Sequence, residues 1–461
     1  MWERVQFGLS ASVHFLFVPL TIGLILILCI LQTCDIYRSN NRLRHLCYFL
    51  ISIFSVHFTM GVVTGIPLQM QFATHLGPFT KYLRQVFGKI LSIEGMSAFF
   101  IASAFIGLYY AGFRYFSKKI HMVIAWGICF ATHLSGFWIL SANAWMQKPV
   151  GVSFGQESCT LNSLWGIVTS DVAQAKFFHT MVSGHMVGAM FVMMIGAYWF
   201  KNNKFIHDAR ILLRLGSVVG LWSAIALIIS GHHQSRLCAQ HQPMKFAVME
   251  GIFESSSTTP LILFSYPDVT QFEHHFCIKI PCLLNILTHH SCDKKIIGIK
   301  ELMRLNKKKI ESGEIGFDLL KKYYPTTDAA AQATIPTVTS IFYGFRVMVG
   351  IGFLLLTYFI YGTIFLKKKS SYSNLFLTIT RWIWPLPWVA ILCGWFVVEH
   401  GRQPWVVYER IPTHMAILKS SHQASIKMTF FILLVFYVVL IILSIVITKK
   451  LICQREKLTK F

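Results

Sequence analysis

Long apolar runs recur along the chain, and charged and polar residues gather in the segments between them. Nine of these runs reach or approach the ~20 residues that a helix needs to cross the hydrocarbon core of a bilayer. The pattern therefore predicts an all-α integral membrane protein, a bundle of nine transmembrane helices with a long external loop between the sixth and the seventh. The expected spans lie at roughly 9–32, 48–70, 91–113, 121–145, 176–200, 211–231, 339–366, 382–399 and 427–448.

The order of the runs divides the chain into three parts. Residues 1–231 hold the first six helices, 232–337 form the external loop, and 338–461 hold the last three helices and a tail. The loop is mixed in charge, and residues 300–313 have the pattern of a helix, which indicates a folded segment rather than a linker. No internal repeat is found, so an inverted-repeat transporter has no support from the sequence.

Composition supports a membrane protein, and the charges give it a direction. The chain is 54% hydrophobic and 13% charged, against roughly 25% charged in soluble domains. A net charge of +23 would suggest a nucleic-acid partner for a soluble protein. Here the basic residues gather after spans one, three, five and seven and in the tail, so by the positive-inside rule these segments are cytoplasmic. This interpretation places the N-terminus outside and the C-terminus inside, with no nucleic acid among the partners.

The 11 cysteines form no C-x-x-C and no C-x-x-C-H motif. Zinc ribbons, thioredoxin-type redox chemistry and covalently attached haem are therefore unsupported. Cys277, Cys282 and Cys292 lie close enough in sequence for a disulfide in an oxidising compartment, but the spacing does not choose a pair.

Ionisable side chains are costly in lipid, so those inside the predicted spans are candidate functional residues. Of the 19 carboxylates, only Glu94 and Glu399 fall within spans, where the alternative is a helix-end carboxylate that reaches interfacial water. Any single histidine could be a hydrogen-bonded packing residue, and Met348 taken alone could belong to the core. The intramembrane candidates among the histidines are His14, His57, His133, His179 and His185.

Five of these residues share one depth. On the predicted topology, all lie within ~14 Å of the outer surface, at 1.5 Å per helical residue. Imidazole and thioether side chains are axial ligands of haem iron, which a bundle can hold between facing helices. No single helix carries the several imidazoles that a haem–copper oxidase needs. The five residues at this depth are His14, Glu94, His179, Met348 and Glu399.

The motifs around these residues resemble one family. Residues 401–405, Gly-Arg-Gln-Pro-Trp, resemble the signature of subunit I of cytochrome bd-type quinol oxidases, and the nine-span order is the same. The resemblance implies a haem-containing quinol:O2 oxidoreductase of a terminal respiratory oxidase. Such a protein passes electrons from quinol through a low-spin b haem to a high-spin pair, where O2 is reduced to water. Further matching segments are 13–21, 93–95, 145–147, 172–180 and 345–348.

The resemblance also assigns haem ligands. His179 and Met348 would be the axial pair of the low-spin b haem, with Arg346 beside its propionates or the quinol. His14 and Glu399 would each bind the iron of one high-spin haem. The cofactors implied are two haem b and one haem d, or a third haem b in place of haem d.

Other residues are assigned to the catalytic surroundings by the same resemblance. Glu94 would face the active-site haem, and Trp395 would lie between the haems. Arg402 and Arg4 would lie near propionates, which suits the preference of a guanidinium for carboxylates.

The quinol site and the proton route follow from the resemblance as well. Lys245 in the external loop would hydrogen-bond a quinone oxygen, and Glu250 would accept a proton from the quinol. Without the resemblance, both would be interpreted as solvated loop charges. Ser135 and Asn143 resemble members of the family's proton routes, although each could be a helix-packing polar residue.

One position departs from the family pattern. Many relatives carry a second glutamate eight residues beyond Glu94, where this chain has Ala102. We expect either water bridged by Ser103 or a carboxylate from a partner subunit to substitute for it.

The resemblance finally implies partners and a location. The expected partners are a second, haem-free multispan subunit, a possible single-span small subunit, quinol, O2 and membrane lipid, in the bacterial cytoplasmic (inner) membrane. Quinol oxidation outside and uptake of protons from the cytoplasm would generate a proton motive force. The alternative left open is a non-enzymatic haem-b electron-transfer protein that has lost O2 reduction.

Overall fold

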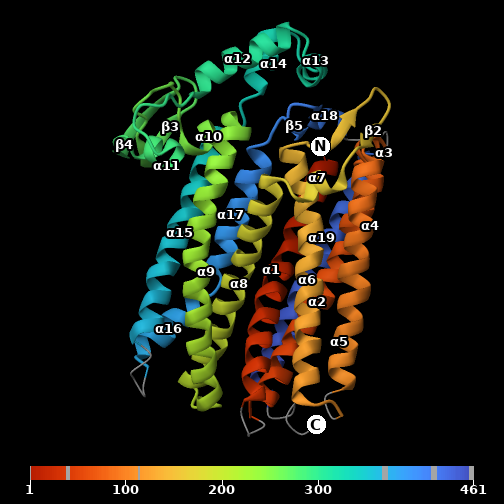
Figure 1. Cartoon of the computed structure of the whole chain (residues 1–461), viewed down its shortest axis with the longest axis vertical. Helices are drawn as coiled ribbons and strands as arrows, with labels where there is room; N and C mark the ends of the chain where they lie inside the picture. The colour runs from red at the N-terminus through yellow and green to blue at the C-terminus, as the bar shows by residue number, and fades with distance from the viewer. Residues whose placement is uncertain (1, 38–41, 113–114, 366–371, 417–422, 456–461) are drawn as a thin grey trace.

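The structure is a computed structural model that describes residues 2–37, 42–112, 115–365, 372–416 and 423–455. Long helices form one bundle with a cap of shorter elements at one end (Figure 1). Eight helices in the described residues are long and apolar enough to cross a membrane. The bundle is built from α1 (Trp2–Ile36), α2 (Arg42–Thr74), α6 (Lys118–Gln147), α8 (Asp171–Lys201), α9 (Ile206–His241), α15 (Val338–Phe365), α16 (Asn374–Ile383) with α17 (Leu386–His400), and α19 (Gln423–Cys453).

The third predicted span is a composite rather than one long α-helix. It consists of α4 (Lys89–Gly95), the π-helical η2 (Met96–Ile101) and α5 (Ala102–Ala111), which follow one another without a break. A π segment widens the helix locally and replaces the i→i−4 hydrogen bonds. The count of nine spans therefore holds only if this composite is included with the eight long helices.

Close helix contacts bring α1 and α8 together. A Cβ added at Gly188 would lie 2.5 Å from the Cα of Gly23, so the two backbones touch where neither residue has a side chain. Around this contact, leucine, isoleucine and phenylalanine side chains from α1, α2, α8 and α9 form the largest buried cluster. Ion pairs at the opposite end from the cap join Asp35 of α1 to Lys118 of α6, and Asp208 of α9 to Arg455.

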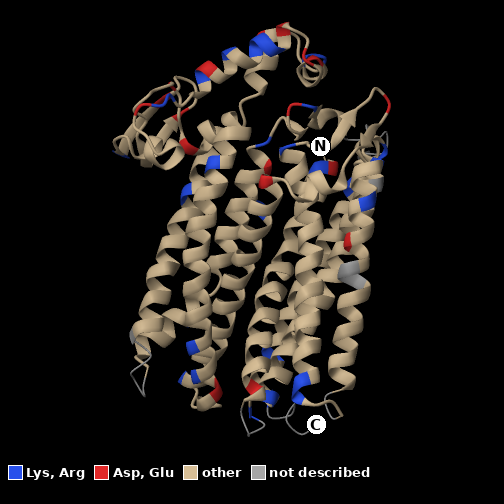
Figure 2. Ribbon diagram, in the orientation of Figure 1, with Lys and Arg blue, Asp and Glu red and all other residues tan. Residues whose placement is uncertain are grey.

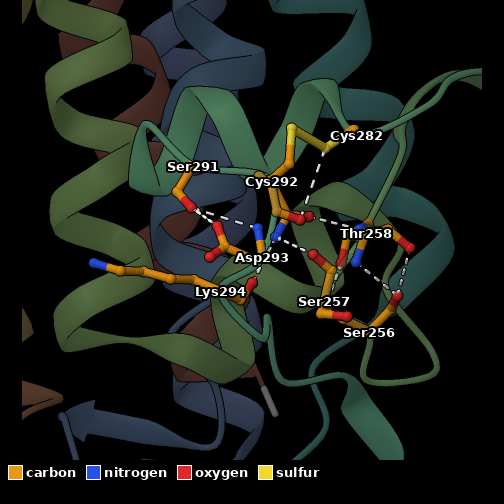
Figure 3. The surroundings of a disulfide bond; sticks show 10 residues. Ser256, Ser257, Thr258, Cys282, Ser291, Cys292, Asp293 and Lys294 are labelled. Carbon is orange, nitrogen blue, oxygen red and sulfur yellow. Dashed lines mark hydrogen bonds between the residues drawn. A yellow bond between two sulfur atoms is a disulfide. The ribbon is translucent and has the colours of Figure 1, made fainter.

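Most of the cap comes from the segment between α9 and α15. It contains α10 (Pro243–Glu250), the antiparallel pair β3 (Leu261–Asp268) and β4 (Glu273–Ile280), α11 (Leu283–His289), α12 (Ile299–Glu311), α13 (Ile315–Lys321) and α14 (Thr327–Ala333). The predicted helix at 300–313 is confirmed as α12. Of the three candidate cysteines, Cys282 and Cys292 form a disulfide, and Cys277 is free (Figure 3).

Smaller elements complete the cap around the ends of the other helices. Trp145, near the end of α6, is fully buried among them. These elements are α3 (Gly77–Tyr82), η1 (Arg84–Gly88), β1 (Val152–Phe154), β2 (Cys159–Leu161), α7 (Leu164–Val168), β5 (Trp405–Val407), β6 (Ile411–Pro412) and α18 (Thr413–Ala416).

Candidate functional site

The two candidate haem-ligating histidines are each held by a hydroxyl. His14 Nδ1 lies 3.1 Å from Thr64 Oγ1, and His179 Nδ1 lies 2.9 Å from Ser230 Oγ. A partner at Nδ1 fixes the orientation of an imidazole and leaves Nε2 as the nitrogen that can bind iron. Within the described ranges, His179 makes no hydrogen bond through Nε2.

The two candidate haem-ligating histidines and the candidate methionine each lie against a glycine. A Cβ at these glycines would crowd the ligand side chain, so the missing side chains leave space beside the ligating atoms. The pairs are His14 with Gly65, His179 with Gly231 and Met348 with Gly394, and the added Cβ would lie 3.2, 3.4 and 2.9 Å away.

The donors suit a haem better than a bare metal ion. In the part of the chain that the structure describes, no group of three or more His, Cys, Asp or Glu side chains is arranged to hold a metal. A haem macrocycle supplies four iron ligands itself and takes only axial ligands from the protein. Single imidazole and thioether donors beside glycines on different helices therefore fit haem.

Glu399, at the cap-side end of α17, belongs to a partly buried charged network. Its Oε2 accepts a hydrogen bond from Arg402 Nη2 at 2.5 Å, and its Oε1 accepts one from Asn143 Nδ2 at 2.9 Å. Arg402 is 5% exposed, and its Nε and Nη1 atoms have no hydrogen-bond partner among the described residues. A buried guanidinium with two free donor atoms fits an anionic group such as a haem propionate.

Lys176 joins this network and was missed as a site residue by sequence reasoning. It is 6% exposed, its Nζ donates to Asn143 Oδ1, and it lies 5.2 Å from the centre of the Trp395 ring. A lysine at the first position of a predicted apolar span was the available signal. The structure thus brings Asn143, from the fourth predicted span, to Glu399 and Trp395 of the eighth, and adds the cation of Lys176 beside them.

Glu94 forms a second polar group with Ser135. The Ser135 hydroxyl donates to Glu94 Oε1 at 2.8 Å, and Gln69 Nε2 donates to Glu94 Oε2 at 3.3 Å. Asn143, predicted on the same route as Ser135, instead contacts Glu399. Ser103 is exposed and hydrogen-bonds to none of these side chains within the described ranges, so the structure does not bring it to the route.

Lys245 and Glu250 on α10 are buried, at 5% and 3% exposure. The interpretation from pattern alone, solvated loop charges, is wrong because α10 packs its apolar side chains against α9 and α15 and carries both charges inside with them. Lys245 Nζ donates to Gln147 Oε1. Burial lowers the pKa of Lys245 to about 8 and raises the pKa of Glu250 to about 7.

Arg346 connects α15 to this pair. Its Nη2 lies 4.0 Å from Glu250 Oε2 and donates to the Ile262 carbonyl at 2.7 Å, while Nη1 donates to the Met249 carbonyl at 2.9 Å. Glu250 Oε2 has no hydrogen-bond partner among the described residues. An unpartnered carboxylate oxygen beside a guanidinium is able to accept a proton.

Three further residues singled out in the sequence have partners of their own. Arg4 on α1 donates to Gln403 Oε1 at 3.4 Å and is exposed, so it lies beside the loop that follows α17. His133 and His185, considered only singly from the sequence, contact each other through Nε2 atoms 3.0 Å apart. This contact depends on how α6 and α8 are aligned, which no sequence pattern reports.

Comparison with known proteins gives one consistent result. Residues 2–456 match the family described as Cytochrome bd terminal oxidase subunit I. The chain is 34% identical to cytochrome bd-II ubiquinol oxidase subunit 1 of Escherichia coli (strain K12), over 90% of each chain. It is 30% identical to cytochrome bd ubiquinol oxidase subunit 1 of Bacillus subtilis (strain 168), over 90% of this chain and 85% of the relative. The bd oxidase structure from Geobacillus thermodenitrificans has the same fold, with a TM-score of 0.83 at 24% identity over 98% and 97% of the chains.

Proposed function

Because the chain belongs to the cytochrome bd terminal oxidase subunit I family, we propose that it oxidises quinol at the cap face and reduces O2 to water inside the bundle. Membership makes it a multi-pass membrane oxidoreductase with haem cofactors and a quinol substrate, working with a second subunit. The observation that carries the finer proposal is the buried pair of Lys245 and Glu250, a cation and a proton acceptor at the cap end of the bundle.

The haem ligands are assigned as the side chains described above. His179 and Met348 would hold a low-spin haem b. His14 would bind one high-spin haem and Glu399 the other. The three haems would be two haem b and one haem d, or three haem b. Bound haem supplies the one-electron carriers and the iron at which O2 is reduced. Arg402, with its free donor atoms, would bind a propionate.

At the quinol site, the chain positions the substrate and takes up its proton. The ammonium group of Lys245 donates a hydrogen bond to one quinol oxygen, and the carboxylate of Glu250 accepts a proton as the quinol loses electrons. Arg346 holds the Glu250 side chain, and its positive charge opposes the burial that favours the protonated carboxyl. The two quinol protons leave on the cap side.

Protons for water formation come from the opposite face. Ser135 and Glu94, which share a hydrogen bond, would deliver them to the O2 site on one side, and Asn143 beside Glu399 on the other. Ala102 offers no carboxylate below Glu94. Because Ser103 is exposed, a carboxylate from the partner subunit fits this gap better than a water held by Ser103.

The orientation follows from charge and from the disulfide. The cap, with its disulfide between Cys282 and Cys292, would face the oxidising outside, and the basic loops would face the cytoplasm. In the bacterial inner membrane, with a haem-free subunit II and a possible single-span subunit, this arrangement converts quinol oxidation into a proton motive force.

Spectroscopy together with O2 uptake tests the proposal. The purified complex, reduced with dithionite, should show b-type haem bands and a further change with CO, and it should consume O2 when given a quinol. A purely low-spin b spectrum with no response to CO and no O2 uptake would instead support the alternative, a haem-b electron-transfer protein without O2 reduction.

A further inference from the structure

The β3–β4 hairpin exposes a group of large apolar side chains, with Phe276 and Tyr266 at 76% and 62% exposure. Ile262 is buried on its inner face, and His275 and Lys279 are exposed beside the apolar group. On the inner face, the Ser265 hydroxyl lies 2.7 Å from His274 Nδ1, and His274 Nε2 donates to the Gly251 carbonyl at 2.6 Å. The exposed apolar side chains are Leu263, Phe264, Tyr266, Phe276, Ile278 and Ile280.

This exposed apolar group is unlike the outer face of a hairpin that faces water. An antiparallel sheet with one solvated face has apolar residues toward the core and polar residues outward. An outward face rich in apolar residues is instead typical of strands that face lipid. A contiguous exposed apolar patch also marks a contact surface in general, so the apolar face alone leaves the choice between lipid and protein.

The position of the hairpin along α15 favours lipid over protein as the contact. The Tyr343 hydroxyl donates to the Ser265 carbonyl at 3.0 Å, and Arg346 Nη2 donates to the Ile262 carbonyl at 2.7 Å. Since α15 begins at Val338, these contacts lie ~8 and ~12 Å along the helix from its cap end. Figure 1 shows β3 and β4 at the edge of the cap, beside the upper part of the bundle.

The outward face of the hairpin also continues an apolar helix surface. Directly below the contacts, α15 presents Val347, Val349 and Phe353 as exposed side chains, on a helix long and apolar enough to cross the membrane. The hairpin tip is polar, since Asp268 accepts hydrogen bonds from the backbone of Thr270 and Gln271. The tip can therefore remain in water while the strands rest on the membrane.

We propose that the outward face of the β3–β4 hairpin lies in the outer-leaflet interface of the bilayer, against phospholipid acyl chains. The hairpin then anchors the external segment to the lipid at the level of Arg346. Its strand β3 would then hold, through the Ile262 carbonyl, the Arg346 guanidinium that lies beside Glu250. The proposed lipid contact depends on the location of the chain in the membrane. It does not depend on the proposed catalytic roles.

A photo-crosslinking experiment identifies what touches the hairpin. Phe276→p-benzoylphenylalanine is introduced into the full complex in nanodiscs of phosphatidylethanolamine and phosphatidylglycerol, which is then irradiated and digested. Mass spectrometry should find peptides carrying a phospholipid adduct at position 276. Phe353→p-benzoylphenylalanine, on the middle of α15, is the positive control, and Ile315→p-benzoylphenylalanine, on the exposed start of α13, is the negative control.

Three outcomes would overturn the proposal. A crosslink from position 276 to the second subunit would make the hairpin a subunit contact, and a crosslink to another copy of this chain would make it a contact between copies. A lipid adduct at position 353 without one at position 276 would place the hairpin in water. Quinol oxidase activity of the position-276 variant, measured in parallel, keeps this result separate from any failure of the catalytic proposal.

Discussion

At the residue scale, burial changes the chemistry of Glu250. Its pKa of about 7 means that the carboxylate, the form that accepts a proton, increases as pH rises through neutrality. The same shift makes the fold less stable as pH rises from about 4.5 to about 7, because a buried carboxyl must then lose its proton. We expect quinol oxidation to rise between about pH 6 and pH 8 for this reason.

The variant Glu250→Gln should lose that rise and oxidise quinol about 100-fold more slowly, the lower range for loss of a general base. Quinol-dependent O2 uptake of the purified complex across pH measures both effects. Glu254→Gln, which removes an exposed carboxylate in the same segment, is the matched control and should keep the normal profile. An unchanged profile in Glu250→Gln would remove this residue from the proton-accepting role.

Met348 is the residue whose role is easiest to isolate. Leucine preserves most of its volume but removes the sulfur, so Met348→Leu should abolish the low-spin haem signal and quinol oxidation while the protein still inserts. Reduced-minus-oxidised spectra of membranes measure the haem, and an immunoblot measures insertion. Met190→Leu, a fully buried methionine on α8, should leave the spectrum intact. A normal low-spin band in Met348→Leu would exclude this methionine as a ligand.

Sequence reasoning found ligand-type residues but not their partners. Glu399 and Glu94 stand out because carboxylates are rare in apolar runs, yet nothing in the pattern pairs the first with Asn143 and Lys176 or the second with Gln69. Such pairings depend on the rotation of one helix against another.

At the element scale, hydropathy located the helices but underestimated their length. The sixth predicted span, 211–231, corresponds to α9, which runs from Ile206 to His241. An apolar window detects only the part of a helix that lies in lipid, and helices continue beyond it with polar residues. The π segment in 96–101 also escaped prediction, because its cause lies in hydrogen bonding rather than in composition.

The segment between α9 and α15 was the least predictable part of the chain. Its helix α12 was found from its periodicity, whereas the β3–β4 hairpin was not, because its exposed apolar residues do not mark a buried face. The burial of α10 was missed for a related reason, since two charges in a short helix suggest water. In both places, neighbouring α15 decides the environment.

The disulfide is predicted to stabilise the turn around α11. It closes a loop of about 11 residues, for which loss of unfolded-chain entropy corresponds to about 3 kcal/mol. In Cys282→Ser, amide hydrogens of residues 283–292 should exchange faster, by up to about 100-fold, while the helical bundle is unaffected. Cys277→Ser, which replaces the free cysteine of the same segment, is the control. Equal exchange in both variants would mean that the packing of Asn285 with its backbone partners suffices.

At the scale of the whole molecule, charge marks the two ends of the bundle. Figure 2 shows acidic and basic residues gathered at the cap and at the opposite end, with few between them. The extended helices carry further carboxylates, and Asp35 and Asp208 are paired with cations at the end away from the cap. The positive-inside rule turns the sum of these charges into an orientation, which stays a prediction.

The proposed orientation gives a prediction for Cys34, an exposed free cysteine at the end of α1 away from the cap. A membrane-impermeant maleimide should label it in inverted vesicles but not in intact spheroplasts, as read by mass spectrometry of the Cys34 peptide. Ser312→Cys, in the cap after α12, should show the opposite pattern. Labelling of Cys34 from outside would reverse the topology and, with it, the side at which quinol protons are released.

The contact between Gly23 and Gly188 has a consequence for electron transfer. Gly23 follows His14 by nine residues and Gly188 follows His179 by nine residues, so both histidines lie ~13 Å from the same point of backbone contact. Under the proposed assignment, that contact sets the tunnelling distance between two redox centres. Electron tunnelling slows exponentially with distance. A single methyl group added between α1 and α8 would therefore lower the electron-transfer rate, although both histidines would still bind their irons.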